Sequence, residues 1–346
     1  MKLISIDIGS DYITVVQGEN TANSVMIKTA YRKALKKGSI VEGKINDKSK
    51  VIEALQYILQ NEKLITKNAA VTINTSNALT REFTVPRGKQ KHVEAMVVNE
   101  MRNTYMCGSS DVIDFKQIKG DIENIEDKSC KIRAFAIHMD DVSNCRDILT
   151  ALKLKPYYLD VHSNAIEKLF TLKPKINGLD MSDKGYMVLD FGYSGILAYI
   201  YSGYELVGFR FIPIGISDFI QAIISNQVNF KNEEEIDITE IIDFNEEQHS
   251  SSQSYNPVID VMAQCTNELQ KIIMYNVSKL PNSILSNIFI YGGGSKMPGI
   301  EKNLSFAFNV EAQVITSFST IKFKDIEKNN DIAHYINAAG ALIRLK

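Results

Sequence analysis

The sequence predicts an α/β protein with two lobes and a small α+β subdomain inserted into the first lobe. One observation is a hairpin pattern that occurs twice, far apart in the chain. A second is the length of 346 residues, which exceeds what one small core organises. A third is a run of strands and helices after residue 80 that interrupts the series of the first lobe. We expect a first lobe of residues 1–80 with 156–184 and 333–346, an insert of 81–155, and a second lobe of 185–332 with a helical subdomain at about 217–285.

The repeated hairpin pattern consists of an apolar strand that ends in Asp-x-Gly and a second apolar strand after a short turn. One copy carries Asp7, Gly9 and Ser10, and the other carries Asp190, Gly192, Tyr193 and Ser194. Glycine lets a backbone approach a ligand closely, and N–H groups in such a turn form an anion-binding concavity. An aspartate beside a phosphate requires a bridging cation, so Asp7 and Asp190 predict Mg²⁺ held largely through water. A single copy is more typical of an ordinary polar turn, and the pair favours a clamp around a polyphosphate.

A third element follows a buried-type strand near the end of the second lobe. Four small residues stand there in a row, Gly292, Gly293, Gly294 and Ser295. A backbone without side chains can lie against a flat base or a phosphate, which makes this loop a candidate for the rest of a nucleotide.

Composition excludes several classes of function. The net charge of -2 and the pI of about 6.3 give no electrostatic argument for nucleic-acid binding, which needs a basic face, and they leave local basic patches open. The four cysteines form no C-x-x-C pair, which excludes a zinc or redox motif and is typical of reduced cytosolic thiols. No run approaches the ~18 apolar residues that span a bilayer, and the first strand leaves no room for a signal peptide. We therefore expect no direct membrane insertion, and any membrane role must come from a partner.

The elements of the first lobe and the insert follow from apolar periodicity. A helix begins at Asp47 or Ser49, and a second helix begins at Asp140 or Asp141. The other predicted elements are strands at 69–73, 83–86, 112–118, 131–138 and 157–161, a helix at 90–103, a polar loop at 120–128 and a connecting helix at 160–170.

The second lobe continues after its hairpin with a helix entered through Gly215. Residues 231–256 are acidic and then rich in Ser and Gln, which predicts a short helix and a mobile loop. Pro257 begins a long helix whose apolar stripe is core and whose polar flank carries Asn267, Glu268 and Lys271. The final helix spans 332–345.

The two hairpins and the glycine loop, in this order, resemble the phosphate 1, phosphate 2 and adenosine motifs of the actin, Hsp70 and sugar kinase superfamily. The resemblance implies a two-lobed actin-like (ribonuclease H-like) ATPase fold that binds ATP or ADP with Mg²⁺ between its lobes. It also implies that Asn267, Glu268 and Lys271 contact the adenosine, although a solvated helix face with an i, i+3 ion pair is an equal alternative. The chain departs from the pattern at Ile216, where relatives usually have a second glycine.

The insert narrows the resemblance to the branch that contains the cell-division protein FtsA and the type IV pilus assembly protein PilM. The stretch 81–86, a helix with Glu94 and Glu100, Asp114-Phe115, and the return at 159–161 resemble the PilM family along nearly the whole chain. This implies a cytoplasmic ATP-binding scaffold that is recruited to the inner face of the cytoplasmic membrane. Its partners would be the N-terminal cytoplasmic peptide of a PilN-like bitopic membrane protein and other pilus components, and self-association is possible.

Two details of this function are expected from the resemblance. The peptide would lie along a strand edge in a groove beside the insert. A water facing the γ-phosphate would be oriented by Asp160, with His162 as second candidate; a packing or capping role is the alternative for both. Because an aspartate reaches less far than the longer side chains of relatives, we expect weak ATPase activity or none.

Two other functions remain open at this point. A small-molecule kinase of the same superfamily would need a catalytic aspartate and a sugar-binding set, and none is evident. An FtsA-like division protein usually continues into an amphipathic membrane helix, whereas this sequence stops at Lys346, which favours the pilus function.

Overall fold

The computed structural model describes residues 2–60, 65–74, 78–118, 128–226, 244, 257–324 and 332–344. The loop expected at 120–128 and the short helix and loop expected at 231–256 fall almost wholly outside these residues. Within them, no helix is long and apolar enough to cross a membrane.

The first lobe is built on a six-stranded sheet with the order β10-β6-β1-β2-β3-β16. The strands are β1 (Lys2–Ile8), β2 (Tyr12–Asn20), β3 (Val25–Ala34), β6 (Asn68–Ile73), β10 (Lys155–Val161) and β16 (Ile321–Phe323). β1, β2 and β3 run antiparallel, and β6 and β10 extend β1 in parallel. A two-stranded ribbon of β4 (Ile40–Val41) and β5 (Lys44–Ile45) lies beside it.

The second lobe repeats this plan in a five-stranded sheet with the order β13-β12-β11-β14-β15. Its strands are β11 (Gly185–Phe191), β12 (Ile196–Ser202), β13 (Glu205–Ile212), β14 (Asn287–Tyr291) and β15 (Glu311–Val314). The first three again run antiparallel, and the last two are parallel to β11. Because the two sheets share this order, β1 and β11 occupy equivalent places in the two lobes.

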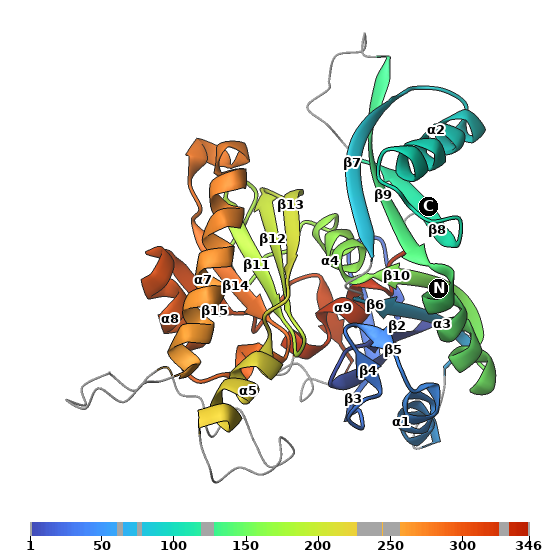
Figure 1. The fold of residues 1–346 in the computed structure, drawn as a ribbon, viewed down its shortest axis with the longest axis horizontal. Helices are drawn as coiled ribbons and strands as arrows, with labels where there is room; N and C mark the ends of the chain where they lie inside the picture. Colours follow the sequence, from blue (N-terminus) through green and yellow to red (C-terminus); the bar gives the residue numbers. More distant parts are fainter. Residues whose placement is uncertain are drawn as a thin grey trace.

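Helices cover the sheets in layers (Figure 1). α5 (Ile216–Asn226), α7 (Pro257–Asn276) and α8 (Ile300–Phe308) share one apolar core with the second sheet. α4 (His162–Phe170) and α9 (Ile336–Gly340) lie between the two sheets and pack against each other. Gly340 allows this contact, because a Cβ there would lie 2.1 Å from the carbonyl oxygen of Ala165.

The insert is a three-stranded antiparallel sheet with a single helix on one face. The sheet has the order β7-β9-β8, with β7 (Leu79–Pro86), β9 (Ser129–His138), β8 (Asp111–Gln117) and the helix α2 (Gln90–Asn103). Val97 and Met101 of α2 are fully buried against Ile132 and Ala134 of β9. The insert therefore has a small core of its own.

Helix α3 (Met139–Ala151) packs away from the insert. Its Cys145, Ile148 and Leu149 are buried in the core that contains α1 (Lys48–Gln60) and the first sheet. β16 likewise belongs to the first sheet, although the second lobe precedes it in the chain. The division of the chain into 1–80, 81–155 and 185–332 stays a prediction. Within it, α3 shares the apolar core of the first lobe, and β16 belongs to the sheet of that lobe.

The structure differs from three local predictions. The N-cap of α3 is His138, whose ring accepts a hydrogen bond from the Asp140 backbone N–H at 3.3 Å, so the expected caps Asp140 and Asp141 are wrong. Asp160 and Val161 complete β10, and the connecting helix begins at His162. The regular part of the last helix is only Ile336–Gly340, shorter than expected. Elsewhere, Asp47 accepts from the N–H groups of residues 49 and 50 and caps α1, one of the two expected caps.

Candidate functional site

The two predicted hairpins meet at a cavity of about 110 Å³ between the lobes, which we call the hairpin cavity. The Ser10 and Ser194 hydroxyls lie 2.8 Å apart and join the two turns directly. Nine of the residues expected from the sequence line this cavity: Asp7, Gly9, Ser10, Asp190, Gly192, Tyr193, Ser194, Gly292 and Gly293. The fold therefore brings together residues from three distant stretches of the chain.

The two turns have the same backbone geometry. Gly9 donates its N–H to the Tyr12 carbonyl at 3.0 Å, and Gly192 donates to the Gly195 carbonyl at 3.0 Å. A Cβ at either glycine would lie within 2.9 Å of that carbonyl oxygen. Both turns thus require glycine for their own closure. The turn of the second lobe forms with isoleucine after Gly215, because the Ile216 N–H donates to the Gly192 carbonyl at 3.1 Å.

His162 lies between the two aspartates. Its Nε2 is 2.7 Å from Oδ1 of Asp7, and its Nδ1 is 3.5 Å from Oδ2 of Asp190. Burial by itself would lower the pKa of His162, but the Asp7 and Asp190 carboxylates outweigh it and raise this pKa to about 10. At neutral pH an imidazolium therefore bridges the carboxylates where the sequence predicts a bridging cation.

Asp190 is also held by a buried chain of hydrogen bonds through Asn337. Asn337 donates to Oδ2 of Asp190 at 2.8 Å and accepts from the Tyr291 hydroxyl at 2.9 Å. Among the described residues, no three His, Cys, Asp or Glu side chains form a metal-binding group. A divalent cation at Asp7 and Asp190 would therefore complete its coordination with water or ligand oxygens.

The glycine loop is only partly at the cavity. Gly292 has a φ of 86°, and a Cβ there would lie 2.6 Å from Oδ1 of Asp190. Gly294 instead packs on the Phe191 ring, where a Cβ would meet a ring carbon at 2.3 Å. The Ser295 hydroxyl donates back to the Gly292 carbonyl at 2.7 Å. Gly294 and Ser295 thus shape the loop from outside the cavity lining.

The polar flank of α7 lies away from the hairpin cavity. Lys271 and Glu268 form an i, i+3 ion pair at 2.5 Å, and Asn267 is exposed. The hydrogen bond from Lys271 lowers the pKa of Glu268. These contacts match the alternative given for these residues, which is a solvated helix face with an i, i+3 ion pair.

Asp160 makes buried contacts outside the hairpin cavity. Its Oδ2 lies 2.6 Å from the Lys168 ammonium, and its Oδ1 accepts from the Asn164 amide at 2.8 Å. Lys168 also donates to the Ile343 carbonyl at 2.6 Å. Asp160 thus ties β10 to α4 and to the chain after α9, and its carboxylate does not line the cavity that holds Asp7 and Asp190.

Several residues that line the hairpin cavity were not predicted from the sequence, including Arg32, Asn74, Thr14 and Asn337. The Arg32 guanidinium stacks on the Tyr12 ring at 3.6 Å and faces the Gly293 backbone across the cleft. A lone arginine in a strand carries no local signal of such a position. Asn337 lies in the final helix, where no local pattern marks it as a partner of Asp190.

A second cavity, of about 170 Å³, lies between the insert and the first lobe; we call it the insert groove. β8 contributes Val112 and Asp114, and β10 contributes residues 159–161. Each strand is last in the order of its own sheet. The remaining lining is Phe135, Ile137, Val142 and Asn164. The groove is therefore mainly apolar and lies between two strand edges.

Helix α4 connects the hairpin cavity to the insert. Its Glu167 contacts the Arg133 guanidinium of β9 and lies 2.6 Å from the Lys116 ammonium of β8. Arg133, fully buried, also donates to Glu82 at 2.8 Å and to the Leu206 carbonyl of β13 at 3.3 Å. Burial lowers the pKa of Lys116 more than Glu167 raises it. Helix α4, which begins at His162, is thus linked through Arg133 to both the insert and the second lobe.

The sequence profile of the family described as Type IV pilus assembly protein PilM matches residues 5–344. The chain belongs to this PilM family. Among solved structures, the "PilM-PilN type IV pilus biogenesis complex" is similar to this PilM-family chain with a TM-score of 0.80 and 18% identity, over 99% of this chain and 98% of the other. No curated protein sequence matches significantly.

Two further solved structures are similar to this member of the PilM family. The ethanolamine utilization protein EutJ from Carboxydothermus hydrogenoformans has a TM-score of 0.52 and 11% identity, over 99% of this chain and 89% of that one. MreB5 of Spiroplasma citri bound to ADP has a TM-score of 0.50 and 12% identity, over 98% and 94%. At these identities the likeness establishes the actin-like fold, as the two equivalent sheets indicate.

Proposed function

We propose that this chain is a nucleotide-binding scaffold of type IV pilus assembly that holds the tail of a PilN-like membrane protein in the insert groove. The observation that carries the proposal is the insert groove itself, where β8 and β10 present two strand edges on either side of an apolar floor. Membership of the PilM family and the likeness to a structure titled as a PilM-PilN complex support it.

The geometry suits an extended peptide that adds a strand to a sheet edge. Main-chain hydrogen bonds would supply affinity, and alternate side chains would enter the groove. Val112, Ile137 and Leu159 offer apolar contacts, and the exposed Asp114 carboxylate suits a basic residue of the tail. Held in this way, the scaffold would lie at the inner face of the cytoplasmic membrane through its partner.

The hairpin cavity is the proposed site of ATP or ADP with Mg²⁺. The residues fit the group, because two glycine-containing turns line the cavity where phosphate oxygens would lie, and the carboxylates of Asp7 and Asp190 would face a hydrated cation. A bound nucleotide with Mg²⁺ would supply negative phosphate oxygens and a divalent charge. The likeness to MreB5 bound to ADP supports this assignment.

The volume of the hairpin cavity adds a condition to nucleotide binding. About 110 Å³ is below the ~300 to 1,000 Å³ of typical ligand pockets. Ser10 and Ser194 must therefore separate, and the His162 imidazolium must leave the position between Asp7 and Asp190. Because Asp160 is paired with Lys168 and His162, the second candidate, is held by Asp7 and Asp190, we assign no side chain to orient water and propose weak turnover or none.

The test is titration of a fluorescent peptide of roughly ten residues, taken from the cytoplasmic N-terminus of a PilN-like protein of the same organism, into the full chain. We expect binding in the micromolar range that is typical of small interfaces. Val112→Arg places a long cation in the groove and should weaken binding at least about tenfold.

Thr84→Arg is the matched control, because it puts the same side chain at an exposed position on β7, the opposite edge of the insert sheet. Binding that Val112→Arg leaves unchanged, or that a scrambled peptide reproduces, would place the partner elsewhere.

A further inference from the structure

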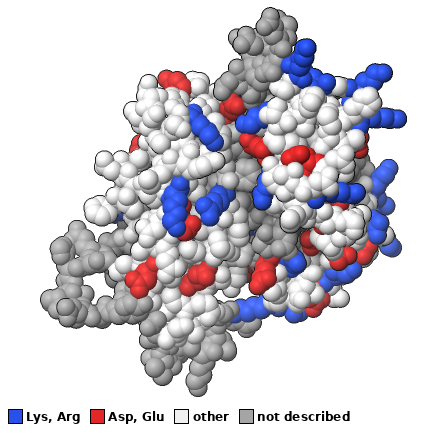
Figure 2. Space-filling model, turned by 45° about the horizontal axis from the view of Figure 1, so that its top comes forward, with Lys and Arg blue, Asp and Glu red and all other residues white. Residues whose placement is uncertain are grey.

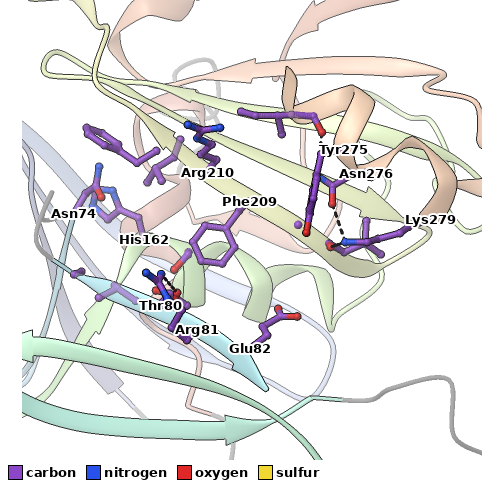
Figure 3. Close-up of a pocket in the computed structure, with 18 of the residues that line it drawn as sticks. Asn74, Thr80, Arg81, Glu82, His162, Phe209, Arg210, Tyr275, Asn276 and Lys279 are labelled. Atoms are coloured by element: carbon purple, nitrogen blue, oxygen red, sulfur yellow. Dashed lines mark hydrogen bonds between the residues drawn. The ribbon is translucent and has the colours of Figure 1, made fainter. Parts of the chain in front are cut away.

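A third cavity, of about 550 Å³, lies beside the hairpin cavity; we call it the β13 cavity (Figure 3). Its walls come from β7 of the insert, the first turn of α4, strand β13 and the end of α7 with the residues that follow. Only Asn74 and His162 line both this cavity and the hairpin cavity. The glycine loop, Asp7 and Asp190 are absent from its lining, so it is a separate site.

Three cationic side chains line the β13 cavity from three different elements. Arg81 lies on β7, Arg210 lies on β13, and Lys279 follows α7. Figure 3 shows Arg210 and Arg81 on opposite sides of the Phe209 ring. Figure 2 shows Lys and Arg side chains on both sides of the furrow between the two halves of the molecule.

None of these three cations has a carboxylate within 4 Å in the described part of the chain. Arg81 donates to the Thr80 carbonyl at 2.9 Å, and Lys279 donates to the Val207 carbonyl at 3.2 Å and to the Asn276 amide oxygen at 3.0 Å. The charge of Arg210 contributes to the lowered pKa of Glu268 without a direct ion pair between the two side chains. Like charges that share a cavity repel one another, and an anion would relieve that repulsion.

Among the described residues that line the cavity, Glu82 is the only carboxylate, and two other cations already form ion pairs with it. It lies 2.6 Å from the buried Arg133 guanidinium and 3.1 Å from the Lys131 ammonium. Burial would raise the pKa of Glu82, but these two cations hold it below its usual range. The cavity therefore retains the charge of Arg81, Arg210 and Lys279.

The rest of the lining suits a planar or apolar group. Phe209 and Phe211 are half-buried, and Tyr275 is 79% exposed at the mouth, with the Lys279 ammonium 5.2 Å from its ring centre. Asn74 and Asn276 add amide groups. Guanidinium groups bind phosphate in a two-pronged geometry, and aromatic faces stack on rings.

We propose that the β13 cavity binds a phosphorylated small molecule that carries an aromatic ring, of the size of a mononucleotide. Its volume lies within the ~300 to 1,000 Å³ of small-molecule pockets. The phosphate contacts one of the two guanidinium groups, Arg210 or Arg81, the other two cations add positive charge, and the aromatic ring lies against Phe209 or Tyr275. Because the walls belong to the insert, to α4 and to the second lobe, such a ligand bridges all three.

The test is calorimetric titration of AMP, GMP, CMP and UMP into full-length Asp190→Asn, which removes one of the two carboxylates of the hairpin cavity. At least one mononucleotide should bind one to one. The matching nucleoside and inorganic phosphate alone should each bind at least about tenfold more weakly, because each lacks one half of the recognised group. The double variant Arg210→Gln/Arg81→Gln should weaken binding by roughly 10- to 100-fold.

Arg102→Gln, an exposed arginine at the end of α2, is the matched control and should leave binding unchanged. All variants are compared by their melting curves, so that a folding defect is recognised. The proposal is overturned if no mononucleotide binds, or if binding is unaffected by Arg210→Gln and Arg81→Gln together. It is also overturned if the nucleoside binds as tightly as the nucleotide.

Discussion

Nε2 of His162 lies 2.7 Å from Oδ1 of Asp7, and the same ring faces Asp190 across the boundary between the lobes. A side chain of the connecting helix α4 thus joins the two hairpins through their aspartates. Because Asp7 belongs to the first lobe and Asp190 to the second, this contact closes the cleft at the place proposed for the phosphates.

Asp190→Asn should abolish stabilisation by Mg-ATP. Ligand at ~100 times its dissociation constant adds about 2.7 kcal/mol to the free energy of unfolding. For a chain of this size the melting temperature should rise on the order of several degrees. Melting curves with and without millimolar Mg-ATP measure this rise. Asp183→Asn, at an exposed position before β11, should retain it. An unmoved melting curve of the wild-type chain would contradict the proposed site.

The free energy of unfolding of the ligand-free chain should fall as pH rises from about 6.5 toward 10. The folded-state pKa of His162, about 10, lies above its ordinary 6.5, so the stabilisation is complete below pH 6.5 and is lost through pH 10. The slope from this group is about 1.4 kcal/mol per pH unit at most. Urea unfolding at a series of pH values measures it. His162→Gln should remove this slope and His92→Gln, on the exposed part of α2, should keep it. Equal slopes in all three chains would disprove an imidazolium between the aspartates.

Asp160→Asn should lower stability without a specific effect on hydrolysis. It leaves the buried Lys168 ammonium without its carboxylate, and breaking a buried pair costs about 3–5 kcal/mol. Urea denaturation gives the stability, and phosphate release per folded chain gives the turnover. Asp147→Asn removes an exposed pair with Lys48 and should cost at most about 1 kcal/mol. A large loss of turnover with stability intact would restore Asp160 as the residue that orients water.

Gly340→Ala should separate α9 from α4. The added Cβ would lie 2.1 Å from the Ala165 carbonyl oxygen, so one helix must shift, at about 1–3 kcal/mol or more. Thermal or urea unfolding measures the loss. Gly88→Ala is the matched control, because its Cβ would make an ordinary 3.8 Å contact with His92. Equal stability of both variants would mean that the two helices do not pack as closely as described.

Much of the fold could be predicted from the sequence, because the patterns that indicate its hairpins and helices are local. The hairpins around Asp7 and Asp190 and helix α2 follow from apolar periodicity and turn chemistry within about twenty residues. The repetition of one hairpin pattern then implied two equivalent lobes with their turns facing one another.

Other features were decided by contacts between distant segments. The strand β10 continues through Val161, so Asp160 points to Lys168 and His162 becomes the residue that enters the hairpin cavity. Helix α3 follows β9, the last strand of the insert, in sequence, but its apolar side chains pack in the core of the first lobe. No local pattern encodes these outcomes, because alternate positions of a strand face opposite ways and a one-residue boundary decides which side chain meets which neighbour.

The sequence by itself therefore determined the two-lobed plan and nine of the residues that line the hairpin cavity. Only the tertiary structure decided that an imidazolium lies between the two aspartates, that Asp160 is committed to Lys168, and that Arg81, Arg210 and Lys279 share a cavity. The physical reason is that charge pairing depends on distance in space, and these partners come from strands and helices that only folding brings together.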